Sequence, residues 1–294
     1  MSHVRVEDVL PPRLGMAIDH QTRTALTSIK YNLKESVRMT NFSEKFGSQI
    51  KANGPRYIRF LKALHSQYVF DWFLEIGSRN GNSLTTVRSK TIAVDPTFSI
   101  TKNVTGLKPE LHLFQKTSDS FFESKFLEKN GIKVSLAFLD GMHLFEYLLR
   151  DFIATERNCA SNGIIMLHDC CPWTREMTTR DLDNLPKGPW TGDVFKLIPI
   201  LQKFRPDLRI HVFDCKPTGL VAVSKLDPGN TVLSEKYHQI VEEYLNVDFS
   251  AQQAERLYGS FSYVSANAEA EADFPLFNGL GRIEEVTKHH KVTP

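Results

Sequence analysis

The sequence predicts an α/β fold built on a seven-stranded, mostly parallel sheet flanked by helices. Short apolar runs alternate with amphipathic segments along the middle of the chain, which is typical of βαβ units. The final two runs are separated only by residues 215–218, too few for a crossover, so they are expected to pair as an antiparallel C-terminal hairpin. The predicted strands are 71–76, 91–95, 110–115, 133–139, 163–168, 208–214 and 219–224.

Helical segments are predicted before and after this core. Residues 1–70 form an N-terminal helical extension, with helices at about 21–37 and 54–64. The core domain covers residues 71–226, and residues 227–294 form a C-terminal helical segment and tail. In that segment, helices are predicted at about 231–245, 251–258 and 266–272.

Composition and charge exclude several classes of function. The 294 residues are 41% hydrophobic and 24% charged, which is enough for one sizeable core. The net charge is only +2 and no block of five Lys or Arg occurs, so no nucleic-acid partner is expected. The chain has no leader-like start and no long apolar stretch, so we expect a cytoplasmic protein without a membrane partner. The cysteine spacing matches neither a redox pair nor a zinc site.

A glycine turn after the first strand is the centre of the predicted site. The apolar run 71–76 has the character of a strand buried on both faces. Gly77 and Gly81 let the backbone turn sharply and approach a ligand, and Asn82 or Ser83 is expected to cap a helix that follows. A ligand is expected at this turn because open α/β sheets bind ligands outside the carboxyl ends of their strands.

Two carboxylates indicate the kind of ligand. Glu75 precedes the first glycine, and the glycines do not follow the G-x-G-x-x-G pattern that binds a pyrophosphate. An anion is poorly accommodated beside Glu75. The strand 91–95 ends in Asp95, a position from which a carboxylate accepts hydrogen bonds from ribose hydroxyls. A cationic nucleoside without phosphates fits these acids better than a dinucleotide.

These residues resemble motifs of the class I S-adenosylmethionine-dependent methyltransferases. A D-G-x-H segment at 140–143 and an H-D pair at 168–169 are similar to the branch that methylates oxygen atoms of small molecules and sugars. Asn162 departs from the paired glycines of that signature. The resemblance implies a Rossmann-like sheet, S-adenosyl-L-methionine as cofactor and a small-molecule acceptor, and it allows a homodimer. It also implies that the N-terminal helices cover the active site, although a packing or oligomer role is an equal alternative.

The resemblance assigns the contacts to the methionine and ribose parts of the cofactor. Gly77, Ser78 and Gly81 would lie against the methionine portion. Glu75 would lie near its ammonium group, directly or through water, and Asp95 would bind the ribose.

The adenine contact is assigned to the segment after the third strand. Asp119 would accept from the exocyclic amine and Ser118 would support it, although Ser118-Asp119-Ser120 is also typical of a helix N-cap. Asp140 completes the cofactor set at the end of the fourth strand.

A second group of residues is predicted to carry the chemistry. Because the ends of neighbouring parallel strands converge, the group would lie beside the methyl donor, where the acceptor must be aligned and deprotonated. In one mechanism His143 is the general base, oriented by Asp169 or Asp140. The predicted catalytic residues are His143, Asp140, His168 and Asp169.

In the other mechanism, a divalent metal lowers the pKa of the acceptor hydroxyl. Its predicted ligands are Asp140, His168 and Asp169. Oxygen ligands favour magnesium, whereas an imidazole shifts the preference towards manganese or iron. The metal-dependent relatives have an acid pair where this chain has His168-Asp169, and His168 without any role is the third alternative.

We therefore interpret the chain as a methyltransferase that acts on a small hydroxylated metabolite or a sugar. The loop 170–193, with Trp173 and Trp190, is expected to help form the acceptor pocket. A non-catalytic cofactor-binding protein, regulatory or involved in assembly, is one alternative, but so many ionisable groups in one place are unneeded for binding alone. A nicotinamide-dependent oxidoreductase is another, and Glu75 with the missing third glycine counts against it.

Overall fold

The computed structural model describes residues 51–281. The helix predicted at 21–37 and the C-terminal tail lie outside the described residues. Inside them, none of the helices has both the length and the apolar character needed to cross a membrane.

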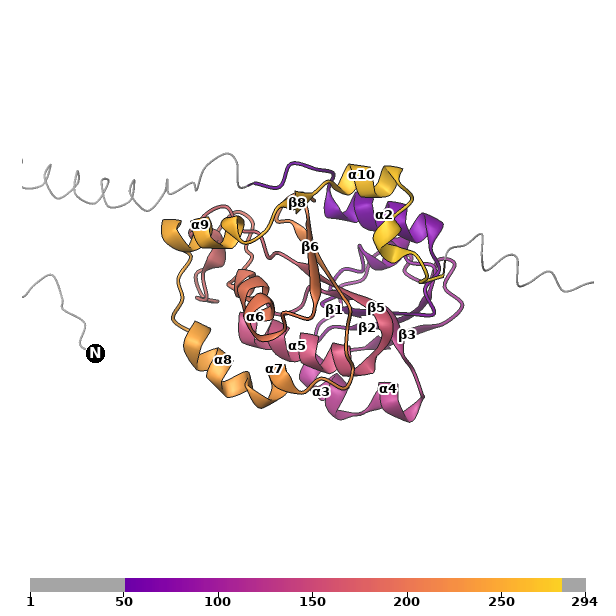
Figure 1. Ribbon diagram of the computed structural model, residues 1–294. Helices are drawn as coiled ribbons and strands as arrows, with labels where there is room; N and C mark the ends of the chain where they lie inside the picture. Colours follow the sequence, from indigo (N-terminus) through magenta and orange to yellow (C-terminus); the bar gives the residue numbers. More distant parts are fainter. Residues whose placement is uncertain (1–50, 282–294) are drawn as a thin grey trace, which may run out of the picture. The chain divides into compact units, whose positions relative to one another are not determined.

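Across residues 51–281 the chain forms an eight-stranded sheet in the order β3-β2-β1-β4-β5-β7-β6-β8 (Figure 1). The strands from β1 to β5 pair in parallel, and β7 runs antiparallel to both β5 and β6. The predicted Rossmann-like α/β fold is confirmed, including its C-terminal hairpin. The bounds are β1 Trp72–Ile76, β2 Lys90–Val94, β3 Leu111–Phe114, β4 Val134–Leu139, β5 Cys159–His168, β6 Arg209–Phe213, β7 Leu220–Ser224 and β8 Tyr263–Val264.

The eighth strand was not predicted from the sequence. β8 is only two residues long and pairs in parallel with the edge of β6. A run of two residues carries no periodic signal, so only the long-range pairing identifies it.

Helices cover both faces of the sheet because successive strand residues point to opposite sides. Leu74 and Ile76 of β1 belong to the hydrophobic cluster that contains α5 and α6, whereas Phe73 belongs to the cluster that contains α2. α2 and α10 lie side by side on that second face (Figure 1). The helices are α2 Tyr57–Gln67, α3 Ser118–Glu123, α4 Phe126–Lys129, α5 Phe145–Asn158, α6 Leu197–Phe204, α7 Val232–Glu235, α8 Tyr237–Tyr244, α9 Ala251–Gly259 and α10 Ala266–Glu271.

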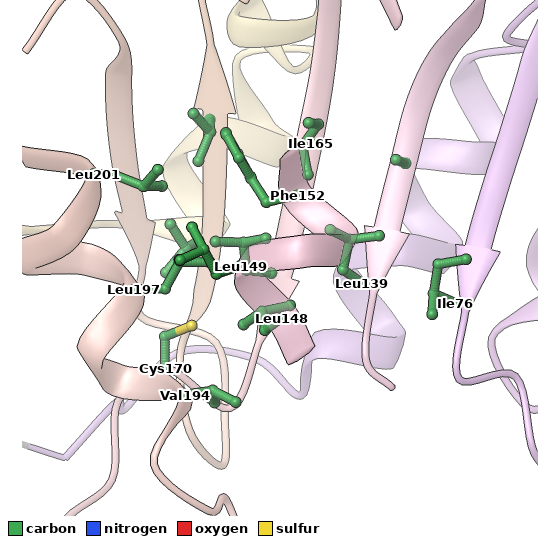
Figure 2. Packing of buried hydrophobic residues seen from close by; sticks show 14 of the residues in the cluster. Ile76, Leu139, Leu148, Leu149, Phe152, Ile165, Cys170, Val194, Leu197 and Leu201 are labelled. Carbon is green, nitrogen blue, oxygen red and sulfur yellow. The ribbon is translucent and has the colours of Figure 1, made fainter. Parts of the chain in front are cut away.

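The cluster on the α5 and α6 face is the larger of the two cores. Figure 2 shows Leu149 and Phe152 of α5 and Leu197 of α6 packed with the strand residues Leu139 and Ile165. All five side chains are at most 1% exposed. This packing fixes α5 against the sheet, and the N-terminus of α5 follows directly after the D-G-x-H segment.

The helix predicted after the glycine turn is absent, because residues 77–89 contain only a short 3₁₀ turn at Leu84–Thr86. Ser83 does not cap a helix, and its hydroxyl donates to Glu75 instead. A crossover between parallel strands with its helix needs about a dozen residues. The connection is close to that minimum, and here it is taken up by the glycine turn and this single 3₁₀ turn. The helix predicted at 231–245 is also divided, into α7 and α8, at Lys236.

Candidate active site

A cavity of about 910 Å³ opens at the carboxyl ends of the central strands. β1 has β2 on one side and β4 on the other, so the strand order reverses at this point. Open α/β sheets bind ligands at such a reversal. The predicted site residues that line the cavity are Gly77, Ser78, Asp95, Ser118, Asp119, Asp140, His143, His168 and Asp169.

The glycine turn brings the ends of β1 and β4 together. Gly77 has a φ of +89°, and a Cβ atom there would lie 2.0 Å from the carbonyl oxygen of Asp140. Gly81 does not line the cavity, and a Cβ atom on it would lie 2.6 Å from a side-chain carbon of Val104. The first glycine therefore shapes the site, whereas the second permits packing behind it.

Glu75 lies beneath the turn and is absent from the cavity lining. The residue is 1% exposed, and the Ser83 hydroxyl donates to its Oε1 at 2.5 Å. Oε2 has no hydrogen-bond partner in the described part of the chain, and the same is true of the Ser78 hydroxyl at the cavity wall. Burial raises the pKa of Glu75 from 4.5 to about 8. The carboxyl group is therefore mostly neutral at pH 7 in the free protein.

Asp95 presents a fixed carboxylate to the cavity. Its Oδ2 accepts a hydrogen bond from the backbone amide of Arg79 at 2.8 Å, and its Oδ1 accepts one from Thr97 at 2.7 Å. The residue is 7% exposed. The two amides orient the carboxylate and leave lone pairs free for two ligand hydroxyls.

Asp119 has a partner that the sequence did not indicate. Arg150 of α5 donates to both of its carboxylate oxygens at 2.8 Å, and this guanidinium lowers the pKa of Asp119. Arg150 also donates to the Tyr237 hydroxyl at 2.8 Å. The N-cap of α3 is Thr117, whose hydroxyl accepts from the amide of Ser120, so Ser118 and Asp119 are not the cap.

The four predicted catalytic residues lie together at the ends of β4 and β5. His168 Nδ1 is 3.1 Å from Asp140 Oδ1 and 3.4 Å from Asp169 Oδ1. His143 Nε2 is 3.5 Å from Asp140 Oδ1, and its Nδ1 is 3.5 Å from Asp169 Oδ2. Thr218, at the turn of the C-terminal hairpin, donates a hydrogen bond to Asp169. Each imidazole therefore lies between two carboxylates.

This arrangement shifts the pKa values of the group. Burial lowers the pKa of His168, but Asp169 and Asp140 outweigh burial and raise it well above its usual value. The pKa of His143 is raised in the same way, against burial, by Asp140 and Asp169. Burial raises the pKa of Asp140, but the two histidines outweigh it and hold that pKa below its usual range. The carboxylates thus favour protonated imidazoles in the free protein.

Comparison with known proteins identifies the family. The sequence profile of the methyltransferase domain family matches residues 14–170. The chain belongs to this family. That membership confirms the resemblance to class I S-adenosylmethionine-dependent methyltransferases. No curated protein matches the chain at a significant level.

Solved structures give distant similarities to this methyltransferase. One is an O-methyltransferase from Bacillus cereus in complex with SAH, with 13% identity, a TM-score of 0.42, and coverage of 65% of this chain and 89% of that one. The O-methyltransferase TomG from Streptomyces achromogenes has 13% identity, a TM-score of 0.42, and coverage of 56% and 78%. MycE, from mycinamycin biosynthesis, was solved with Mg and SAH and has 15% identity, a TM-score of 0.40, and coverage of 59% and 49%. At these low identities and TM-scores, none of the three structures indicates the substrate of this methyltransferase.

The geometry of a possible metal site in this methyltransferase differs from the predicted set. Asp140, His143 and Asp169 each offer one ligand atom, and these atoms lie within 4.8 Å of one another. His168 is not in this group, since its Nδ1 is hydrogen-bonded to Asp140 and its Nε2 is buried. Two carboxylates and one imidazole fit a divalent cation, and the nitrogen donor favours manganese or iron over magnesium.

Three aromatic residues, Tyr57, Tyr147 and Trp190, also line the cavity of the methyltransferase. The Tyr57 ring lies on the His168 ring with centroids 4.1 Å apart. It enters from the first turn of α2, which is held by a hydrogen bond from the Tyr57 amide to the Lys216 carbonyl. No local signal marks this residue, because α2 and β5 are distant in sequence. Of the loop 170–193, which is described throughout, Trp190 alone lines the cavity.

Proposed function

We propose that this methyltransferase transfers the methyl group of S-adenosyl-L-methionine to a hydroxyl group of a small molecule. The observation that carries the proposal is that one cavity contains both Asp95 and the group Asp140, His143, His168 and Asp169. The first suits a nucleoside ribose, and the second suits deprotonation of an acceptor. A volume of about 910 Å³ is in the range of cavities that bind small molecules.

The cavity lining and the carboxyl group behind it fit the cofactor at three points. The Asp95 carboxylate is oriented for the ribose diol. The Ser78 hydroxyl lies at the wall where the methionine portion would lie. Glu75 is close behind, and a cation at the turn would stabilise its ionised form. The cofactor, when bound, supplies an electrophilic methyl group on a sulfonium.

Two mechanisms for removing the acceptor proton fit these residues. In the first, neutral His143 accepts the proton at Nε2, and the neighbouring Asp140 stabilises the resulting imidazolium. In the second, Asp140, His143 and Asp169 hold a divalent cation, which would lower the pKa of a hydroxyl group bound to it. In both, Asp169 is oriented by Thr218 and His168 neutralises part of the carboxylate charge.

The test is calorimetric titration of the chelator-treated protein with S-adenosylhomocysteine. The titration is repeated with magnesium, manganese or iron(II), and with NADH as the control ligand. We expect saturable binding of S-adenosylhomocysteine and none of NADH. Transfer of labelled methyl groups to a panel of hydroxylated small molecules, with and without each metal, then distinguishes the two mechanisms. Absence of S-adenosylhomocysteine binding under every condition would refute the proposal.

A further inference from the structure

Residues 190–193 of the long loop contact both the side chain and the main chain of His143. The Trp190 indole stacks on the imidazole, with ring centroids 4.8 Å apart and planes inclined by 27°. The Trp190 carbonyl oxygen lies 3.0 Å from Nδ1 of the same imidazole. The Asp193 amide donates to the His143 carbonyl oxygen at 3.2 Å. The loop therefore contacts this histidine from the face of its ring, from one nitrogen and from its backbone.

Gly192 makes this approach sterically possible. Its φ is +53°, and a Cβ atom there would lie 1.6 Å from the carbonyl oxygen of His143. Any other residue would force the two backbone segments apart. By contrast, a Cβ atom on Gly188 of the same loop would meet nothing within 4 Å.

The segment is itself anchored on both sides. The Trp190 indole nitrogen donates to the Thr179 carbonyl at 2.9 Å, and the Gly192 amide donates to the Met177 carbonyl at 3.1 Å. The Asp193 side chain reaches the next element, since its Oδ1 accepts from the Phe145 amide at the start of α5. The segment is thus tied to the helix that follows His143.

Further ion pairs hold Asp193 in place. Its Oδ2 accepts from Arg180 at 2.6 Å and from Lys196 at 2.7 Å. The side chains of Asp193 and Lys196 are 4% and 1% exposed. Buried charges that are paired in this way keep one geometry, because moving either partner leaves the other uncompensated.

The Trp190 carbonyl fixes which way the His143 ring faces. A carbonyl oxygen only accepts hydrogen bonds, so Nδ1 is the nitrogen that donates to it. Nε2 then lies on the side of Asp140. A ring free to rotate would present Nε2 to an acceptor only part of the time.

We propose that Trp190 and Gly192 are positioning residues that hold the His143 imidazole in one orientation. Trp190 acts through its ring and carbonyl oxygen, and Gly192 acts by allowing the backbone contact. The proposal rests on the proposed function, in which Nε2 of His143 faces the acceptor. It gives the long loop a role in ordering the site as well as in enclosing the acceptor.

The test compares Gly192→Ala with Gly188→Ala, two identical changes in one loop. We expect Gly192→Ala to lower kcat for methyl transfer about 100-fold, the order of loss that a displacement of about 1 Å produces. Affinity for S-adenosylhomocysteine should stay within about threefold, because the cofactor residues lie on other elements. Gly188→Ala should match the parent in both measurements. An unchanged kcat in a folded Gly192→Ala protein would overturn the proposal.

A second pair keeps the proposal testable if Gly192→Ala does not fold. Trp190→Ala removes the stacked ring, whereas Trp190→Phe keeps an aromatic ring on the imidazole. Methyl transfer and S-adenosylhomocysteine binding are measured for both variants. We expect Trp190→Ala to lower kcat at least about 10-fold and Trp190→Phe to restore most of it, with the affinity for S-adenosylhomocysteine unchanged in both. The same kcat in the parent and both variants would refute the positioning role, whereas failure of the parent to bind S-adenosylhomocysteine would refute only the proposed function.

Discussion

Replacing Glu75 by Gln should change how the stability of the fold depends on pH. Burial raises the pKa of this carboxyl group from 4.5 to about 8. Between these values the folded protein binds more protons than the unfolded chain, so the free energy of unfolding falls as pH rises. The stabilisation is fully present below pH 4.5 and is lost as pH rises through about 8. One pH unit corresponds to about 1.4 kcal/mol for a single group.

The expected difference is large enough to measure by urea unfolding. From pH 6 to pH 9 the free energy of unfolding should fall by about 2 to 3 kcal/mol more in the parent than in Glu75→Gln, because the amide does not ionise. Asp151, whose pKa burial raises to about 7, titrates in both proteins and does not affect the comparison. Glu128→Gln, at an exposed position on α4, should behave as the parent. Equal pH dependence in the parent and Glu75→Gln would show that Glu75 is not neutral in the folded protein.

Two further predictions separate cofactor binding, chemistry and stability. Asp95→Ala should weaken binding of S-adenosylhomocysteine at least about 10-fold in calorimetry, since even one hydrogen bond to a charged group contributes about 1.5 to 3 kcal/mol. Asp169→Asn should bind S-adenosylhomocysteine normally and lose methyl transfer, and asparagine tolerates the φ of +59° at this position. Equal losses of cofactor affinity in Asp95→Ala and Asp169→Asn would mean that the cofactor site and the catalytic site are wrongly divided. Glu156→Ala should lower the free energy of unfolding by about 1.5 to 3 kcal/mol, because the Arg205 side chain, which is 1% exposed, loses a charged hydrogen bond but keeps Asp207 as a partner. Glu243→Ala, which breaks an exposed pair, should cost less than about 1 kcal/mol in the same urea titration, and similar losses in both would contradict this account.

Most of the sheet could be predicted because its signals are local. Leu74 and Ile76 face one core and Phe73 faces the other, so the first strand is an apolar run that needs no partner to be recognised. The antiparallel hairpin followed from the short connection 215–218, since chain length alone forbids a crossover. The two-residue β8 had no such signal. The prediction of a helix after the glycine turn was wrong: it rested on the motif alone, and the connection holds only a 3₁₀ turn.

The site was predictable to the extent that it lies at strand ends. Asp95, Asp140 and Asp169 each follow a strand of one parallel sheet, and such ends meet at one edge. The pairing of Asp119 with Arg150 was not predictable, because the two residues come from different helices. Tyr57 was missed for the same reason, since its contact with His168 depends on how α2 packs.

The sequence by itself therefore determined where most strands lie along the chain, the glycine turn and the acids at the strand ends, because periodicity and motif spacing act over a few residues. The tertiary structure decided which partner each polar group has. Glu75 is buried beneath Ser83, and His143 is stacked under Trp190 from a loop 47 residues away. Hydrogen bonds and burial depend on distances in space, and these distances are set only when the sheet, its helices and the long loop pack together.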